Sequence, residues 1–196
     1  MVGSWLALVA YTAVVYGFLP FGPRVGVALG RVPLGAWLLG PGTIILTVAG
    51  GVGLAATLVR RGAPPRAYAL LTAATAGYAL AFSWLRSQHL ERTHLPEYGI
   101  AACLAWRALG PVLPAGLPGY VAAAMLATAI GYGDELLQKV VPGRVYDLRD
   151  VAMNGVGAVL GTVLLAAALS RATAGDGALR RAARDAEALD RPAFLP

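Results

Sequence analysis

The chain of 196 residues is poor in charge, cysteine and histidine, and these shortages exclude several kinds of protein. Asp, Glu, Lys and Arg make up 13% of the residues, whereas hydrophobic residues make up 58%, far above the share in a soluble domain. The only cysteine, Cys103, rules out a disulfide framework and a cysteine metal site. The sequence has no serine-centred nucleophile elbow and no glycine-rich phosphate loop, so it offers no common hydrolase or nucleotide-binding signature.

Apolar runs long enough to cross a bilayer recur along the chain. They lack the period-two alternation of strands and are dominated by Ala and Leu, and backbone groups within a bilayer must bond internally, so helices are expected. The predicted fold is an all-α, polytopic transmembrane helical bundle with about six membrane-embedded helices. The runs are residues 2–20, 41–59, 67–86, about 95–112, 119–138 and 150–171.

The segment 21–40 interrupts this pattern with two prolines, five glycines and two arginines. It is a poor span, and the sequence leaves open whether it forms a span, a loop or an interfacial helix.

Basic residues outnumber acidic ones by 16 to 10, and in an apolar chain this balance favours cytoplasmic arginine and anionic lipid headgroups over nucleic acid as partners. The turn "RRGAPPR" at residues 60–66 carries uncompensated positive charge. We therefore expect a multi-pass protein of the cell membrane with this turn and the tail, residues 172–196, in the cytoplasm. The polar motifs would then face outward.

The stretch "HLERTHLPEYG", residues 89–99, collects scarce ionisable groups between two apolar runs. It holds both histidines of the chain, His89 and His94. If a helix begins near residue 90, Glu91, His94 and Tyr98 share one face.

A second polar cluster lies in residues 131–157. Asp134, Glu135 and Gln138 fall on the last turns of the fifth apolar run, and a Pro-Gly turn follows. Beyond it, the spacing i, i+3 and i+7 predicts a stripe at the start of the sixth run, made of Asp147, Asp150 and Asn154. With six spans, both clusters lie at the same membrane side, so we predict that they converge at one end of the bundle.

The segments "ERTHLPEYGIAACLAWRAL" and "DELLQKVVPGRVYDLRDVAMNGVGAVLG" resemble the VanZ-like family of bacterial membrane proteins. H-x-x-E-Y, D-E-x-x-Q, P-G-R and D-x-x-D-x-x-x-N-x-x-G match its pattern in order and spacing. The resemblance covers residues 67–171, which would form the family domain after N-terminal helices in residues 1–66. The family's namesake is associated with resistance to the glycopeptide teicoplanin, which implies a cell-envelope setting.

The resemblance implies a ligand-binding site made of motif residues. They are Glu91, His94, Glu97, Tyr98, Asp134, Glu135, Gln138, Arg144, Asp147, Asp150 and Asn154. The motif glycines continue at 155, 157 and 161, and Gly157 with Gly161 forms a G-x-x-x-G pattern that allows close approach of helices.

Three interpretations of the polar clusters stay open. A binding site would capture an amphipathic lipid or a lipid-linked envelope precursor. An enzyme would use His94 as acid or base, tuned by Glu91 or Glu135, with Arg144 holding an anionic group of such a precursor.

In the third interpretation, ion pairs only tie helix ends together. The pairs are Glu91–Arg92, Glu135–Arg144 and Asp147–Arg149. No cofactor and no metal are expected, since a site of His94 with nearby carboxylates would have few nitrogen ligands. The oligomeric state is left open.

Overall fold

A computed structural model describes residues 2–37, 41–85, 91–114 and 116–171, and within these ranges every regular element is a helix. The elements are α1 (Val2–Phe18), α2 (Gly22–Gly30), α3 (Pro33–Trp37), α4 (Thr43–Arg60), α5 (Pro65–Trp84), the short 3₁₀ turn η2 (Glu91–Thr93), α6 (His94–Leu109), α7 (Leu117–Gln138) and α8 (Leu148–Leu169). The predicted all-α fold is confirmed. Each of the six apolar runs contains a long helix.

Two of these helices, α4 and α8, are long and apolar enough to cross a membrane. Helix α1 is apolar but has only 17 residues. Helix α7 has 22 residues, but its last turns carry Asp134, Glu135 and Gln138, which lower its hydropathy. The prediction of six membrane spans is therefore not confirmed as a whole, although the helices themselves are present.

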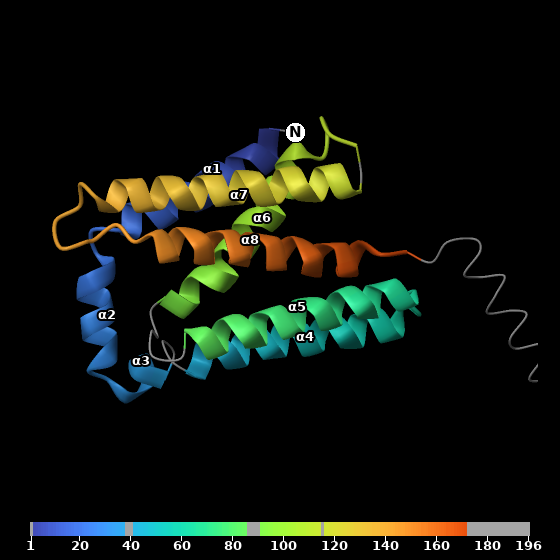
Figure 1. Cartoon of the computed structure of the whole chain (residues 1–196), viewed down its shortest axis with the longest axis horizontal. Helices are drawn as coiled ribbons and strands as arrows, with labels where there is room; N and C mark the ends of the chain where they lie inside the picture. The colour runs from blue at the N-terminus through green and yellow to red at the C-terminus, as the bar shows by residue number, and fades with distance from the viewer. Residues whose placement is uncertain (1, 38–40, 86–90, 115, 172–196) are drawn as a thin grey trace, which may run out of the picture.

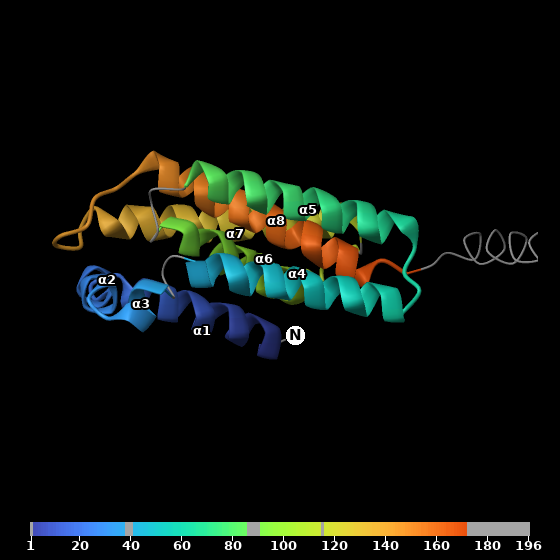
Figure 2. The same cartoon turned by 90° about the horizontal axis from the view of Figure 1, so that it is seen from below.

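Helices α6, α7 and α8 pack against one another at the centre of the bundle. Helix α1 covers α6, α5 lies along α8, and α4 packs on α5 at the outside (Figures 1 and 2). Much of the central core consists of buried alanines. Because small side chains let helix backbones approach closely, this composition suits a tightly packed membrane bundle.

Helices α6 and α8 approach each other closely at the predicted G-x-x-x-G pattern. A Cβ at Gly161 would lie 2.6 Å from the carbonyl oxygen of Gly99, and a Cβ at Gly157 would lie 2.6 Å from that of Leu95. Any side chain at either position would thus collide with the backbone of α6. The predicted packing role of these two glycines is confirmed.

Gly161→Ala is expected to lower the stability of the purified protein by about 1–3 kcal/mol, because the added methyl group must push two helix backbones apart. Gly155→Ala on the same helix is the matched control. Its Cβ would first meet Thr128 at 3.5 Å, an ordinary contact, and alanine favours the helix. Thermal unfolding in detergent compares the two variants. Equal melting temperatures would contradict this packing.

The segment 21–40 holds the short helices α2 and α3, with residues 38–40 outside the described part. Helix α2 lies across the end of the bundle, roughly perpendicular to the long helices (Figures 1 and 2). Its 9 residues extend about 14 Å at 1.5 Å per residue, well short of the roughly 30 Å of hydrocarbon in a bilayer. The described part of this segment is therefore a short-helix cover of one bundle end rather than a span.

Candidate functional site

The start of α6, the end of α7 and the start of α8 meet at the bundle end that α2 covers (Figure 1). The predicted convergence of the two polar clusters is observed for the described residues. This end carries His94, Glu97, Tyr98, Asp134, Glu135, Gln138, Arg144, Asp147, Asp150 and Asn154. Glu91 opens the turn η2 at the same end, but its side chain lies outside the described part, as does His89.

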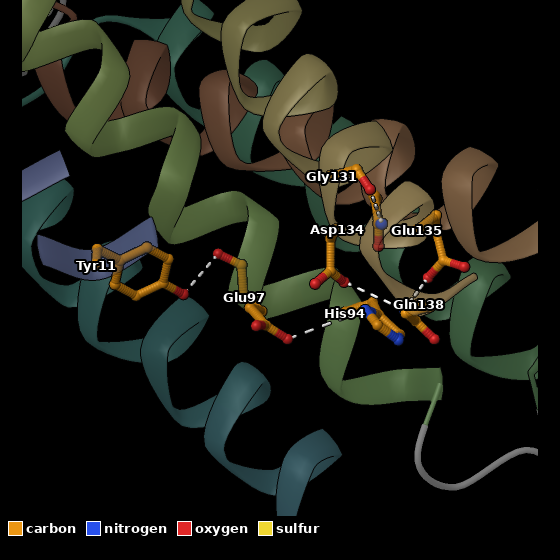
Figure 3. Close-up of polar contacts among 8 residues, drawn as sticks. Tyr11, His94, Glu97, Gly131, Asp134, Glu135 and Gln138 are labelled. Carbon is orange, nitrogen blue, oxygen red and sulfur yellow. Dashed lines mark hydrogen bonds and ion pairs between the residues drawn. The ribbon is translucent and has the colours of Figure 1, made fainter. Parts of the chain in front are cut away.

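One group of these residues forms a buried framework between α7 and α8. Glu135 has no exposed surface and Gln138 is 1% exposed. Glu135 accepts a hydrogen bond from Nε2 of Gln138 (Figure 3). It accepts another, of 3.2 Å, from the backbone N–H of Asp147. The Asp147 carboxylate in turn caps α8 by accepting from the backbone N–H of Arg149 at 2.8 Å. These bonds tie the end of α7 to the start of α8.

A second framework contact lies one turn deeper. Nδ2 of the buried Asn154 donates a 3.1 Å hydrogen bond to the backbone carbonyl of Gly131 (Figure 3). A Cβ at Gly131 would lie 2.6 Å from Cβ of Asn154 and 3.0 Å from the ring of Tyr98. Gly131 is therefore required for α7 to pack against both neighbouring helices, and Asn154 and Tyr98 are packed inside the bundle.

A cavity of about 340 Å³ lies beside this framework, between the bundle and α2. One wall is polar and contains Thr93, His94, Glu97, Asp134 and Arg144. The opposite wall is apolar and comes from the end of α1 and from α2. It contains Val15, Phe18, Leu19, Val25 and Leu29, with Gly22 and Gly26 between them.

Three side chains of the polar wall come from two facing helices (Figure 3). His94 Nδ1 of α6 lies 4.0 Å from Oε2 of Glu97, one helical turn along. The His94 ring also stacks on Tyr98, with ring centroids 6.2 Å apart. Across from them, Oδ2 of Asp134 in α7 accepts a 3.4 Å hydrogen bond from Gln138, which joins the cavity wall to the framework.

Arg144 enters the cavity from the loop between α7 and α8. Its backbone N–H donates to the carbonyl of Val141 at 3.1 Å, closing a turn around Pro142 and Gly143. Gly143 has φ +80°, the left-handed value that favours glycine at the third position of a type II turn, after proline. The P-G-R motif thus places the arginine at the cavity.

The Glu135–Arg144 ion pair that the third interpretation includes is not formed in the described chain. Glu135 points into the framework, where a side-chain amide and a backbone N–H take both of its oxygens. Arg144 instead lies on the cavity wall.

Three polar atoms of this wall are buried and make no hydrogen bond to the described chain. They are Nδ1 of His94, Oδ1 of Asp134 and Nε of Arg144. Buried polar groups are nearly always hydrogen-bonded, and a lone one costs about 1–3 kcal/mol. The three residues all line the same cavity, and convergent polar groups of this kind are typical of ligand sites.

A family model described as VanZ/LLP1 matches residues 68–169, which is more than half of the chain. The chain belongs to the VanZ/LLP1 family. The match spans α5 to α8 and includes the whole polar wall of the cavity. No curated protein and no solved structure matches the chain. Together with the two apolar helices long enough to span, membership of this family indicates a membrane protein.

The apolar wall and two anchoring tyrosines lie outside the VanZ/LLP1 match and were not predicted. The Tyr11 hydroxyl of α1 donates to the backbone carbonyl of Glu97 at 2.9 Å, and the Tyr16 hydroxyl donates to that of Ile130 at 2.6 Å. These bonds hold α1 against α6 and α7 beside the cavity. In the sequence, Tyr11 and Tyr16 are visible only as tyrosines in an apolar run, which packing explains equally well.

The described residues contain no group of three or more His, Cys, Asp and Glu side chains placed to hold a metal ion. The 4.0 Å separation of His94 and Glu97 also exceeds hydrogen-bonding distance. His94 and Glu97 therefore do not form an oriented, hydrogen-bonded pair in the described structure. The site presents a cation, carboxylates and an imidazole opposite an apolar wall, which suits binding of an amphipathic molecule.

Proposed function

We propose that this VanZ/LLP1 protein is a multi-pass membrane protein that binds an amphipathic membrane lipid or a lipid-linked envelope precursor in the cavity beneath α2. The polar head of the ligand would contact His94, Glu97, Asp134 and Arg144. Its hydrocarbon chain would lie along the apolar residues of α1 and α2.

The two-sided lining of the cavity carries this proposal. Ligand sites typically combine an apolar lining with a few convergent polar groups. Here the polar groups occupy one wall and the apolar residues the other. Such a separation matches a molecule with a charged head and a hydrocarbon chain better than a wholly polar solute.

The scaffold interpretation accounts for only part of the motif. The contacts of Glu135, Gln138 and Asn154 are internal to the bundle and serve its stability. Arg144 has no such role, because it forms no ion pair with the described acids and lines the cavity. We assign Arg144 to ligand binding for this reason.

We also propose that the cavity end faces outward and that the opposite end is cytoplasmic. Described basic residues lie at both ends, but all described acids lie at the cavity end, so the charged residues described at the far end are arginines alone. Among them, Arg66 donates a 2.7 Å hydrogen bond to the backbone carbonyl of Arg171, so the 60–66 turn and the end of α8 are neighbours. Arginine near helix ends favours the cytoplasmic side whether or not acids accompany it, so the proposal rests on the clustered arginines of the 60–66 turn.

A topology reporter tests this orientation. A reporter fused after Pro196 and one inserted in the 60–66 turn are both expected to be active only in the cytoplasm. Insertion into the 140–146 loop provides the opposite control, with activity expected only outside. Activity of the Pro196 fusion exclusively outside the cell would reverse the proposed orientation.

Filling the cavity tests the binding proposal. Val25 of α2 lines the cavity, so Val25→Trp should displace the ligand chain. Val27 on the same helix is 58% exposed and does not line the cavity, and Val27→Trp is the matched control. Native mass spectrometry after mild detergent extraction should find bound lipid on the wild type and Val27→Trp, with most of it lost from Val25→Trp.

Equal lipid occupancy in all three proteins would reject the cavity as the binding site. The proposed link to glycopeptide resistance is measured separately, as teicoplanin sensitivity of a host expressing each protein. Val25→Trp should lose any protection that Val27→Trp retains at equal amounts of inserted protein.

A further inference from the structure

The cavity presents both signs of charge within one small volume. Arg144 supplies a guanidinium, and Asp134 and Glu97 supply two carboxyl groups. Arg144 and Asp134 are near enough to interact electrostatically, and so are Asp134 and Glu97. The opposite wall offers no charge to compensate them.

These groups lie near one another without forming a direct ion pair between Arg144 and a carboxyl group. Within the described chain, no ion pair of 4.0 Å or less joins Arg144 to either carboxyl group. Arg144 is fixed by its glycine turn, and Asp134, only 2% exposed, is held by Gln138 through Oδ2. Nε of Arg144 makes no hydrogen bond to the described chain, whereas the Asp134 carboxyl group also interacts with the Tyr98 hydroxyl.

A ligand with a single sign of charge fits this wall poorly. A purely anionic head would satisfy Arg144 but would approach two carboxyl groups, and a purely cationic head would leave the half-buried guanidinium of Arg144 unmatched. Unmatched buried charges are strongly unfavourable. A head with an anionic and a cationic group a few bonds apart matches both sides of the wall.

We propose that the cavity selects a zwitterionic lipid headgroup of the aminoalkyl phosphate class, the chemistry of phosphoethanolamine. Its phosphate oxygens bind the guanidinium of Arg144, for which the planar fork is suited. Its ammonium group donates to Asp134 and Glu97. This inference rests on the proposed function and specifies the ligand class for the same site.

The size of the cavity and its apolar wall indicate that the head is attached to a hydrocarbon chain. A volume of about 340 Å³ is near the lower end of the roughly 300–1,000 Å³ range of ligand pockets. It admits a headgroup and the first part of a chain but not a whole two-chain lipid. The remaining chain would extend from the cavity into the bilayer.

Lipid selectivity tests the inference. The purified full-length protein is delipidated and titrated with phosphatidylethanolamine, phosphatidylglycerol or soluble phosphoethanolamine, with binding followed by native mass spectrometry. The wild type should bind phosphatidylethanolamine about tenfold or more tightly than phosphatidylglycerol, as expected for one added charge-assisted hydrogen bond. Asp134→Asn keeps the shape and should lose this preference. Glu97→Gln, at a half-buried position, is a second variant that should weaken it.

Each outcome has a separate meaning. Equal binding of the two phospholipids by the wild type, or an unchanged preference in folded Asp134→Asn and Glu97→Gln, would overturn the zwitterion inference and leave the proposed function standing. Binding of soluble phosphoethanolamine as tightly as the lipid would contradict the inference that the bound headgroup is attached to a hydrocarbon chain. Absence of binding by either phospholipid would instead count against the proposed function itself.

Discussion

Arg144→Gln is expected to lower the affinity for phospholipid by about tenfold or more, because a charge-assisted hydrogen bond to phosphate contributes roughly 1.5–3 kcal/mol. The melting temperature should stay near that of the wild type. The side chain of Arg144 makes no hydrogen bond through Nε and no ion pair in the described chain, and its turn is closed by the backbone. Lipid titration and thermal unfolding on the same preparation measure both quantities.

Arg149→Gln is the matched control for this variant. Arg149 lies at the same end of the bundle, and the variant removes the same charge. The guanidinium of Arg149 lies over the ring of Trp84, 5.6 Å from the centroid, and does not line the cavity. Its affinity for lipid should remain close to that of the wild type. A similar loss in both variants would mean that Arg144 acts through overall charge rather than by contacting the ligand.

Glu135→Ala is expected to have the largest effect on stability. It removes the acceptor of two donors, Nε2 of Gln138 and the part-buried backbone N–H of Asp147. A buried donor left unsatisfied costs about 1–3 kcal/mol, and Nε2 of Gln138 keeps only its 3.4 Å bond to Asp134. With about 2–4 °C per kcal/mol for a chain of 150–250 residues, the melting temperature should fall by several degrees or more. Glu135→Gln retains one acceptor oxygen and should have an intermediate effect.

Lipid bound per folded molecule should be unchanged in both Glu135 variants. This readout separates a framework residue from a ligand-binding one, since a framework residue changes only the amount of folded protein. If Glu135→Ala melted like the wild type yet bound no lipid, Glu135 would belong to the binding site and the division into framework and cavity wall would be wrong.

The helices and the meeting of the motifs could be predicted from the sequence. Apolar runs of about 20 residues predict helices by composition alone. The spacing of Asp147, Asp150 and Asn154, combined with the alternating direction of successive helices, predicts one polar end. Both inferences depend on local periodicity and on the order of elements along the chain, which the sequence states directly.

The division of the motif residues could not be predicted in the same way. Asp134 and Glu135 are adjacent in the sequence, yet one lines the cavity and the other lies in the framework. Neighbouring positions on a helix are about 100° apart, so which of them faces a cavity depends on how α7 is rotated against its neighbours. The Glu135–Arg144 pair does not form because Glu135 accepts from the backbone N–H of Asp147, at the start of α8, instead of from the arginine.

The apolar wall was not predicted because it has no chemical signature. Val25 and Leu29 are ordinary residues of a glycine-rich segment whose structure the sequence left open. Only the long-range packing of α1, through Tyr11 and Tyr16, brings that segment over the polar end. Tertiary contacts between distant elements of this kind are not encoded in the spacing of any motif.

An experimental structure of the protein in lipid nanodiscs containing phosphatidylethanolamine tests the central claim most directly. We expect density for a headgroup between Arg144 and Asp134, continuing as a chain beside Val25 and Leu29. Glu135 should remain bonded to Gln138 and the Asp147 backbone. A cavity closed by protein side chains, with lipid ordered only around the outer faces of α4 and α5, would contradict the account.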